Sequence, residues 1–580
     1  MKLSVSAFQA SCSASAQKIL HHHAPSYGST SSTAAAVLQP APIQHSTPPH
    51  LAKRPNPTVK TLLLCESNFN GIKKAEYSYA MIIPGNSGTD KVCVAVPPDT
   101  VYDYHGRDYL LMPYSTQNVY PDPLNPKATV SRWQQFLKAM NMTPYNADEE
   151  FDRTLLVRMI DLYNFTHNFD YKMFEYAIKI LGTPAGSKVM KDSIFLFFSQ
   201  SFVYLLRDFT KDMPDQITAP LRLLRNTQNN DLEDYEIETV VICRLQAIYI
   251  MGAALLSLFP KRSSSTLHSL LPYGDYPPIN LGDFLRVKST DSATSISMKL
   301  QKLLCFFNYF NASFNKDYAP KEEYKLSFSR QRIKEFPKWM DSLKPMCKVS
   351  FTDEKIEDAK GDFLRVDFAN RQVGGGILTH GLVQEEILFC CYPEMLIGSL
   401  LNEAMCYNEA AFFRGVRRFN NYKGYSETFE YTGNCCTGEE AMDEENYIKS
   451  RFVAMDAYPF TNRDDQYKIQ CIERELRKAF AGFRPIDDFI GDVCTGFWGC
   501  GVFGGDPQLK YLIQWLVCSE VQRNMTFSTY KAGKEAENLK KIHKKIEKKK
   551  VTVGQLYRFL MMGQVDLKQG VLKQVVKYFK

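Results

Sequence analysis

Apolar residues recur at three- and four-residue spacing through the first half of the chain. This spacing is typical of amphipathic or buried helices. Clusters of Ser, Asp and Pro separate the segments that show it. We therefore expect the region from about 130 to 310 to be helical, with helices over Arg132 to Met142, Phe151 to Asn164, Lys191 to Arg207 and Ile237 to Phe259.

The pattern changes after about residue 320. Short runs rich in β-branched and aromatic residues predict strands there, and helical patterns lie between the later ones. Strands that alternate with helices favour an α/β layer architecture. The predicted strands are Tyr324 to Phe328, Cys347 to Phe351, Phe363 to Phe368 and Arg451 to Met455, and the predicted helices are Gln384 to Cys391 and Pro507 to Ser519.

Near the end, Lys534 to Lys550 is a helical stretch dominated by lysine. A solvated helix face explains such a stretch more simply than contact with nucleic acid does. The formal net charge of +7 over 580 residues is a mild bias. It suits a polyanionic partner and does not indicate sequence-specific binding to nucleic acid.

The first 60 residues are rich in Ser, Ala, Pro and His, and the first acidic residue is Glu66. We expect a disordered tail at 1–60, followed by an extended or irregular lead-in segment at 61–129. The lack of acids also fits a mitochondrial transit peptide. The apolar run from Val240 to Phe259 contains Arg244 and Gln246, so it favours a buried helix over a membrane span.

A first candidate site follows the predicted strand that carries Asp367. That strand leads into three consecutive glycines, Gly374, Gly375 and Gly376. Glycines reach positive φ and let a ligand approach the backbone closely, so we expect their amides to point at phosphate oxygens. Glu385 and Glu386 then open a helix. Beside a glycine loop and an aspartate, these glutamates are better explained as functional carboxylates than as acids that merely favour the helix dipole.

A second candidate site runs from Gly491 to Asp506, where six of 16 residues are glycine. A helix is predicted to follow from Pro507. A glycine-rich loop that leads into a helix N-terminus can hold a diphosphate. The spacing matches neither the P-loop nor the dinucleotide-binding fingerprint.

At these two segments the chain resembles the poly(ADP-ribose) glycohydrolases. The run GGGILTHGLVQEE resembles the family's signature, and TGFWGCGVFGGD is similar to its second glycine loop. The likeness covers about 130 to 575. It implies an α/β protein with a macrodomain-like three-layer α/β/α catalytic domain at 316–580, preceded by an all-helical accessory domain at 130–315.

The resemblance also implies roles for individual residues. Glu386 matches the family's general acid/base, and Glu385 and Asp367 match its companion acids. Phe497 replaces an asparagine common in the family, and Lys531-Ala532 stands where the family tends to have Gly-Asp. The implied substrate contacts are Ile356, Glu357, Asn370, Gly374, Gly375, Gly376, Gln384, Tyr425, Phe497, Trp498, Gly499, Cys500, Gly501, Val502, Phe503 and Tyr530.

The activity that this resemblance implies is hydrolysis of ribose–ribose O-glycosidic bonds in poly(ADP-ribose), mainly by exo-cleavage that releases ADP-ribose. It needs no metal and no cofactor. The expected partner is the polymer on modified proteins, with no membrane, for a monomeric protein of the nucleus or cytoplasm that serves the DNA damage response. Two alternatives remain: a non-catalytic macrodomain that binds the polymer, and a hydrolase that removes single ADP-ribose units from proteins.

Overall fold

The computed structural model describes residues 170–206, 236–259, 279–315, 324–562 and 570–579, with shorter stretches between 59 and 142, Tyr163, and residues 221 and 223–225. The predicted disordered tail therefore lies outside the described residues, apart from the first two residues of a strand at 59–63. Most of the helix predicted over Phe151 to Asn164 lies outside them as well.

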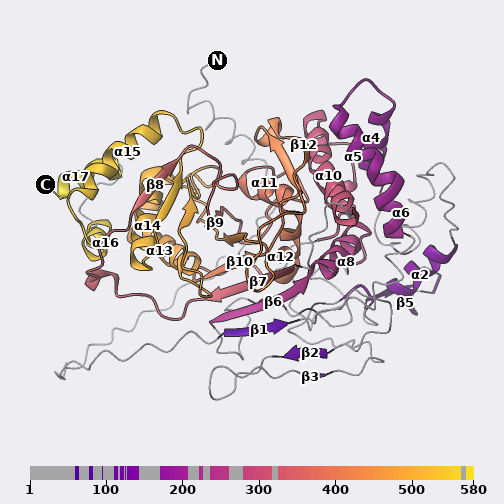
Figure 1. Cartoon of the computed structure of the whole chain (residues 1–580), viewed down its shortest axis with the longest axis horizontal. Coiled ribbons are helices and arrows are strands. Elements are labelled where there is room, and N and C mark those ends of the chain that lie inside the picture. The colour runs from indigo at the N-terminus through magenta and orange to yellow at the C-terminus, as the bar shows by residue number, and fades with distance from the viewer. Residues whose placement is uncertain are drawn as a thin grey trace, which may run out of the picture.

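One large mixed sheet organises the described part of the chain (Figure 1). Its strands follow the order β3-β2-β1-β6-β7-β10-β13-β9-β14-β15-β8. In that order the strands are β3 (Val94–Ala95), β2 (Ser78–Met81), β1 (Val59–Leu63), β6 (Ile237–Cys243), β7 (Lys325–Arg332), β10 (Glu409–Arg414), β13 (Arg451–Ala454), β9 (Leu364–Asp367), β14 (Val493–Thr495), β15 (Met525–Ser528) and β8 (Val349–Thr352).

The sheet is parallel where the candidate residues lie. Strands β13, β9, β14, β15 and β8 pair in parallel, whereas β6, β7, β10 and β13 pair antiparallel. Two small ribbons stand apart, β4 (Val119–Pro121) with β5 (Thr129–Ser131), and β11 (Asn420–Lys423) with β12 (Glu430–Asn434). A parallel half needs helical crossovers between its strands, and helices follow β9, β13 and β14.

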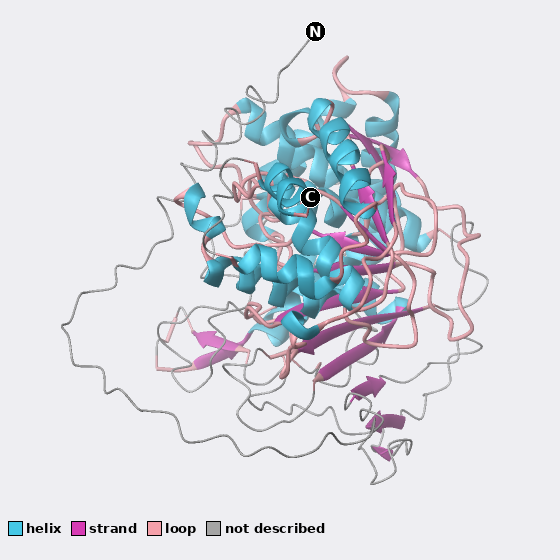
Figure 2. Ribbon diagram, turned by 90° about the vertical axis from the view of Figure 1, so that its left-hand side faces the viewer, coloured by secondary structure: helices cyan, strands magenta, loops and turns pink. Residues whose placement is uncertain are grey.

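Helices cover both sides of the sheet (Figures 1 and 2). Those before β7 are α2 (Arg132–Met142), α4 (Lys172–Leu181), α5 (Lys188–Leu196), a π-helical turn at Phe197–Ser201, α6 (Phe202–Tyr204), α8 (Arg244–Leu255), α9 (Gly282–Leu285) and α10 (Ala293–Phe314). Those after it are α11 (Gln384–Cys391), α12 (Leu396–Leu401), α13 (Ile469–Phe483), α14 (Pro507–Glu520), α15 (Lys534–Glu547), α16 (Val553–Met561) and α17 (Val571–Tyr578). Short 3₁₀ turns occupy Trp339–Asp341, Pro393–Met395, Ser426–Thr428 and Arg463–Tyr467.

The two faces of the sheet belong to two hydrophobic cores. On β13, Phe452 packs into the core shared with α8, α10 and α11, while the next residue, Val453, packs into the core shared with α13, α14 and α16. Successive side chains of a strand point to opposite faces, so the sheet is the middle of three layers. The expected α/β/α arrangement is present in this part of the chain.

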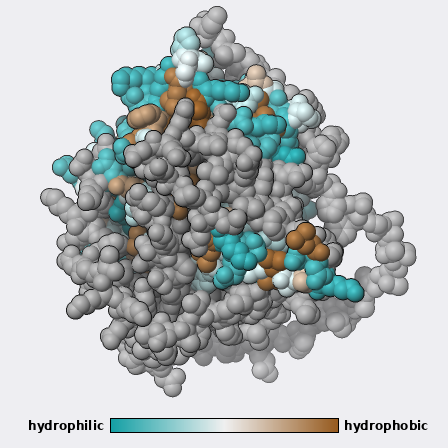
Figure 3. Space-filling model, turned by 90° about the vertical axis from the view of Figure 1, so that its right-hand side faces the viewer, coloured by the Kyte–Doolittle hydropathy of each residue, from teal (hydrophilic) through white to brown (hydrophobic). Residues whose placement is uncertain are grey.

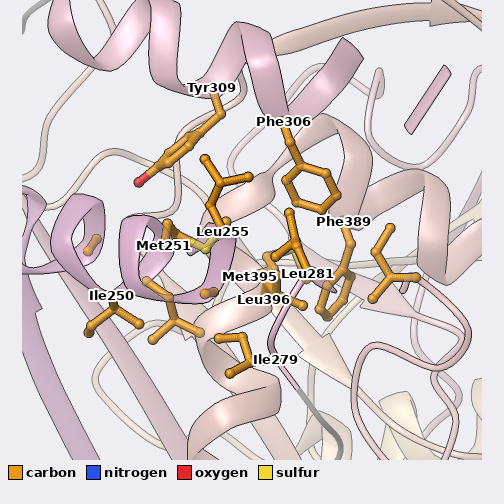
Figure 4. Close-up of a cluster of buried hydrophobic side chains, with 14 of the residues drawn as sticks. Ile250, Met251, Leu255, Ile279, Leu281, Phe306, Tyr309, Phe389, Met395 and Leu396 are labelled. Carbon is orange, nitrogen blue, oxygen red and sulfur yellow. The ribbon is translucent and has the colours of Figure 1, made fainter. Parts of the chain in front are cut away.

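The first of these cores joins the helical region to the candidate site. Figure 4 shows Phe306 of α10 close to Phe389 of α11, with Ile250 and Met251 of α8 and Met395 in the same cluster. The helix that carries the two glutamates is thus held by side chains from residues before 315. The division into an accessory and a catalytic domain stays a prediction.

The helix predicted over Ile237 to Phe259 is wrong in its first seven residues. Ile237–Cys243 forms β6, which is buried along its length and pairs antiparallel with β7, and α8 begins only at Arg244. A continuous apolar run does not distinguish a buried strand from a buried helix. The helical region therefore contributes a strand to the main sheet.

In the ranges that the structure describes, no helix is long and apolar enough to span a membrane. On the side that carries α4 and α5, the described surface is mixed, with hydrophilic residues around smaller hydrophobic patches (Figure 3). Exposed apolar side chains there include Phe195 and Val189.

Candidate active site

The candidate residues gather at one edge of the sheet, where the parallel strands end. Asp367 is the last residue of β9, Ile356 and Glu357 follow β8, and Tyr530 follows β15. The second glycine loop, 496–506, joins β14 to α14. In open α/β sheets, ligands bind at the carboxyl ends of the strands, so the topology makes this edge the place to look for chemistry.

Glu385 and Glu386 lie in the first turn of α11 and bind the loop that precedes them. Glu385 accepts hydrogen bonds from the amides of Asn370, at 2.9 Å, and Gly374, at 2.7 Å. Glu386 accepts them from Gly376, at 2.8 Å, and from Val383, at 2.9 Å. Both side chains are buried, and 3% and 5% of their surfaces stay exposed. The glutamates thus fix the loop as well as supply carboxyl groups.

Gly375 has φ of +47°, and its position shows how close the two glutamates come to the loop. A Cβ built on it would clash with Oε2 of Glu385 and lie 2.8 Å from Oε1 of Glu386. One point beside the backbone is therefore bracketed by oxygens of both carboxyl groups. Glycine fits here because it has no Cβ and adopts positive φ without strain.

Asp367 completes a group of three buried carboxyls. It is fully buried, and neither carboxyl oxygen has a hydrogen-bond partner in the described part of the chain. Burial raises the pKa of Asp367 well above its usual value, and the negative charge of Glu386 adds to this. The pKa of Glu385 is also raised, by burial and by both neighbouring acids, against the lowering effect of its two amide donors. Both groups thus favour the protonated, neutral form.

The expectation that the triple-glycine amides point at phosphate is wrong. The amides of Gly374 and Gly376 donate to Glu385 and Glu386, and that of Gly375 donates to the carbonyl of Gln372. Buried carboxyl oxygens need donors, and the nearest ones are these amides. The loop is shaped around the acids.

Gln384, predicted to contact substrate, binds the end of β9 instead. Its amide oxygen accepts from the backbone N–H of Phe368 at 2.7 Å, and its amide nitrogen donates to the carbonyl of Val366 at 3.1 Å. These bonds tie the start of α11 to the strand that carries Asp367. They set the distance between the aspartate and the glutamates.

Lys302, which the sequence did not single out, holds the same loop from the other side. Its ammonium comes from α10, is fully buried, and donates to the carbonyls of Gly376, Ile377 and Thr379 at 3.2, 2.9 and 2.9 Å. Burial lowers its pKa to about 8, although the negative charge of Glu386 acts in the opposite direction. A lysine 72 residues upstream of the first triple-glycine residue left no signal in the local pattern.

The second glycine loop rests on a buried group of charges. The Lys510 ammonium forms an ion pair with Glu475 and lies 3.9 Å from the ring centroid of Trp498. A Cβ on Gly505 would come within 3.0 Å of the Lys510 side chain. The Trp498 side chain is fully buried and donates to the carbonyl of Met455 at 2.9 Å, so it supports the loop.

Several amides of this second loop are used within it. Those of Trp498, Cys500 and Gly505 donate to carbonyls of the same loop, so they are not free for a diphosphate. The Phe497 ring packs edge-to-face against Phe527 at 5.3 Å and offers no polar group to a ligand. The same loop contains the other predicted contacts, Gly499, Gly501, Val502 and Phe503. Gly501 and Val502 are exposed, and Gly499 and Phe503 are partly buried.

At the ends of β8 and β15, aromatic rings surround a lysine. The Lys355 ammonium lies 3.7 Å from the ring centroid of Tyr422 and 5.9 Å from that of Tyr530. The Tyr422 hydroxyl donates to the carboxylate of Glu357. The Tyr530 ring is 38% exposed, which leaves it available for stacking. Ile356, by contrast, is buried and packs in a small cluster with Cys494.

Tyr425 comes from a different part of the fold. It precedes the 3₁₀ turn Ser426–Thr428 in the connection between β11 and β12. Its half-buried ring packs on the core that contains α10 and α11.

Among the described residues, no group of three or more His, Cys, Asp or Glu side chains is arranged to hold a metal ion.

Comparison with known proteins relates the second half of the chain to one protein family. Residues 336–537 match the family described as "Poly (ADP-ribose) glycohydrolase (PARG), Macro domain fold". A "Probable poly(ADP-ribose) glycohydrolase 2" of Arabidopsis thaliana is 31% identical over 314 residues, covering 45% of this chain and 58% of the relative.

Two further relatives give similar values. The "Poly(ADP-ribose) glycohydrolase 1" of Caenorhabditis elegans is 31% identical over 48% of this chain and 36% of its own length. The protein of the same name in Arabidopsis thaliana is 33% identical over 36% of this chain and 50% of its own length. The chain thus spans roughly half the length of the curated relatives it matches, or less.

Proposed function

Because residues 336–537 make this chain a member of the poly(ADP-ribose) glycohydrolase family, we propose that it hydrolyses ribose–ribose O-glycosidic bonds in poly(ADP-ribose). Cleavage is mainly from the chain end and releases ADP-ribose. One observation carries the proposal: three buried carboxyl groups, Asp367, Glu385 and Glu386, meet under a glycine loop at the carboxyl edge of the sheet.

In this mechanism Glu386 is the acid and then the base. Breaking the bond between the anomeric carbon of one ribose and the hydroxyl oxygen of the next produces an oxocarbenium-like state, and the leaving oxygen needs a proton. Glu386 enters the reaction in its protonated form and gives that proton. It then takes one from the water that attacks the anomeric carbon, so the residue ends as it began. The carboxyl groups of both glutamates lie directly beside Gly375, so one sugar bound at this loop can be reached by both.

The other two acids limit the negative charge of the site. The substrate carries a diphosphate, and three carboxylates beside it would repel it. Burial and the neighbouring acids raise the pKa values of Asp367 and Glu385, which favours the neutral form of both groups. In this form Glu385 orients ribose hydroxyls, and the buried Asp367 adds no negative charge to the site.

The remaining contacts divide along the sheet edge. The loop 497–503 holds the diphosphate, and Tyr530 stacks on adenine next to Glu357. The exposed Tyr530 ring and the exposed turn at Gly501 and Val502 support this division. Asn370 and the triple glycine line the ribose side. Residues 130–315 act as the helical support of this catalytic unit.

The test compares wild type with Glu386→Gln, in which the amide oxygen can still accept the bond from Gly376. Purified protein is incubated with poly(ADP-ribose), and free ADP-ribose is measured. We expect the variant to lose at least about 10³-fold in turnover, because proton transfer and water activation are both lost, and to bind ADP-ribose as wild type does. Near-normal release by the variant refutes the role of Glu386.

Two substrates separate the alternatives. A non-catalytic macrodomain binds the polymer and releases nothing from it. A hydrolase for single units frees ADP-ribose from a mono-modified protein faster than from polymer. Either result with the wild-type protein overturns the proposed activity.

A further inference from the structure

Helix α15 presents an apolar face to the protein and a lysine face to solvent. Its buried residues pack into the core with α14 and β15, and His543 shares a hydrogen bond of 2.7 Å with the Tyr511 hydroxyl. The opposite face is exposed. Along it, at spacings of seven and four residues that keep one side of a helix, lie Lys534, Lys541 and Lys545, and Lys548 follows at the C-cap, three residues further on.

This segment holds most of the excess charge of the chain. Residues 531–550 contain nine lysines and three glutamates, a net charge of +6, and the entire chain carries +7. Lysines four apart, such as Lys541 and Lys545, repel each other and weaken a helix. A polyanion along this face would relieve the repulsion, and ordinary solvation needs no such concentration of one sign.

The lysine face begins at the candidate site. Helix α15 starts four residues after Tyr530, and the Lys531 ammonium lies 5.1 Å from the centroid of that ring. Halfway along α15, Lys540 lies 3.4 Å from the carboxylate of Asp353, which directly follows β8. The helix therefore runs from the carboxyl edge of the parallel strands to the outer end of the molecule, beside α17 (Figure 1).

We propose that the outward face of α15 is a second binding site for poly(ADP-ribose), which holds polymer beyond the unit at the glutamates. The inference rests on the proposed function for the identity of the ligand. Each repeat of the polymer carries a diphosphate, so successive repeats supply the charges that four aligned ammonium groups attract. Such a site makes the enzyme prefer long chains without changing the reacting centre.

The test replaces Lys534, Lys541, Lys545 and Lys548 by Gln together. A matched control replaces four exposed lysines that lie elsewhere, Lys127, Lys338, Lys348 and Lys449. Both sets are placed in the Glu386→Gln protein, so that polymer survives the measurement. Fluorescence anisotropy then gives the affinity for long poly(ADP-ribose) and for free ADP-ribose at several salt concentrations.

We expect the α15 variant to bind long polymer at least about tenfold more weakly, while its affinity for ADP-ribose is unchanged. Its salt dependence should fall by about 3 in the slope of log affinity against log salt, for four lost phosphate contacts to a single strand. The control variant should match its parent. Because the four side chains are exposed, circular dichroism should show both variants folded.

Three results would overturn the proposal. The first is equal affinity and equal salt slope for the α15 variant and its parent. The second is an equal loss in the control variant, which would mean that overall charge alone matters. The third is tighter binding of single-stranded polyadenylate with the same number of phosphates, which would assign the face to nucleic acid. A wild-type protein that binds polymer through α15 and does not cleave it would refute only the proposed catalysis.

Discussion

The Nζ of Lys302 lies 2.9 Å from the carbonyl oxygen of Ile377, so a buried cation on α10 holds the loop that follows the triple glycine. Two further carbonyls of that loop bind the same ammonium. On its opposite side the loop donates amides to Glu385 and Glu386. The loop is thus bound through its carbonyls by Lys302 and through its amides by the two glutamates, and its conformation depends on both.

Lys302→Met should impair catalysis by releasing this loop. The side chain is of similar length, but it offers no donor to the three carbonyls. We expect kcat to fall by about 10²-fold, as for misplacement of catalytic groups by about 1 Å, with a smaller change in KM. Steady-state kinetics on poly(ADP-ribose) measures kcat and KM separately.

Lys299→Met is the matched control. Lys299 lies one turn earlier on α10, is equally buried, and binds Asp291 and the carbonyl of Arg286 instead of the loop. Its replacement should cost stability and leave kcat near that of wild type. Equal losses of kcat in the two variants would contradict the positioning role of Lys302.

Gly375→Ala should destabilise the protein. The new methyl group would clash with Glu385 Oε2, and the residue would have to keep φ at +47°. We expect a loss of about 2–4 kcal/mol in the free energy of unfolding from the clash and the strained backbone. Gly501→Ala in the second loop meets no atom within 4 Å and should cost less than about 1 kcal/mol. Chemical denaturation of both variants measures the difference.

Asp367→Asn should change how stability depends on pH. The folded chain keeps the proton on Asp367 at pH values where the unfolded chain has released it. Stability therefore falls as the pH rises from about 4 through the raised pKa. The amide cannot titrate, so stability should fall less steeply with rising pH in the variant than in wild type.

The exposed Asp362, just before the same strand, provides the comparison. Asp362→Asn removes an exposed carboxyl instead of a buried one, so its profile gives the baseline for the loss of one acid. Denaturation at a series of pH values tests both variants. An Asp367→Asn profile that runs parallel to wild type would show that the carboxyl is ionised in the folded protein.

Lys510→Met should cost about 3–5 kcal/mol of stability, because it leaves the buried Glu475 without one of its cations. Adding Glu475→Gln should restore part of this loss, since the uncompensated charge is then gone. The double-mutant cycle gives the coupling energy. Additive effects would mean that the two groups do not interact.

The local parts of the site could be predicted from the sequence. The helix Gln384–Cys391 begins and ends where the pattern placed it, because its acids, its apolar run and Pro393 all act within a few residues. The helix from Pro507 is also confirmed. Its start is marked by a proline and by Asp506, which accepts the amides of Gln508 and Leu509.

What the sequence did not show depends on contacts between distant residues. Lys302 reaches the loop only because α10 packs beside α11, and Gln384 is occupied only because β9 lies next to it. The triple-glycine amides could not be assigned to the glutamates before the turn of the loop was known. For Ile237–Cys243, pairing with β7 overrode a pattern that helix and strand share.

The pairing of β6 with β7 bears on how this protein can be shortened. A fragment that starts after residue 315 would keep both glycine loops and all three acids, but it would lose the neighbour of β7. That strand would become a bare edge, with an open row of amides and carbonyls that recruits other chains into aggregates. Because β1 pairs with β6 in turn, soluble fragments for crystallisation or screening should begin upstream of Val59, at a length that the matched family segment alone would not suggest.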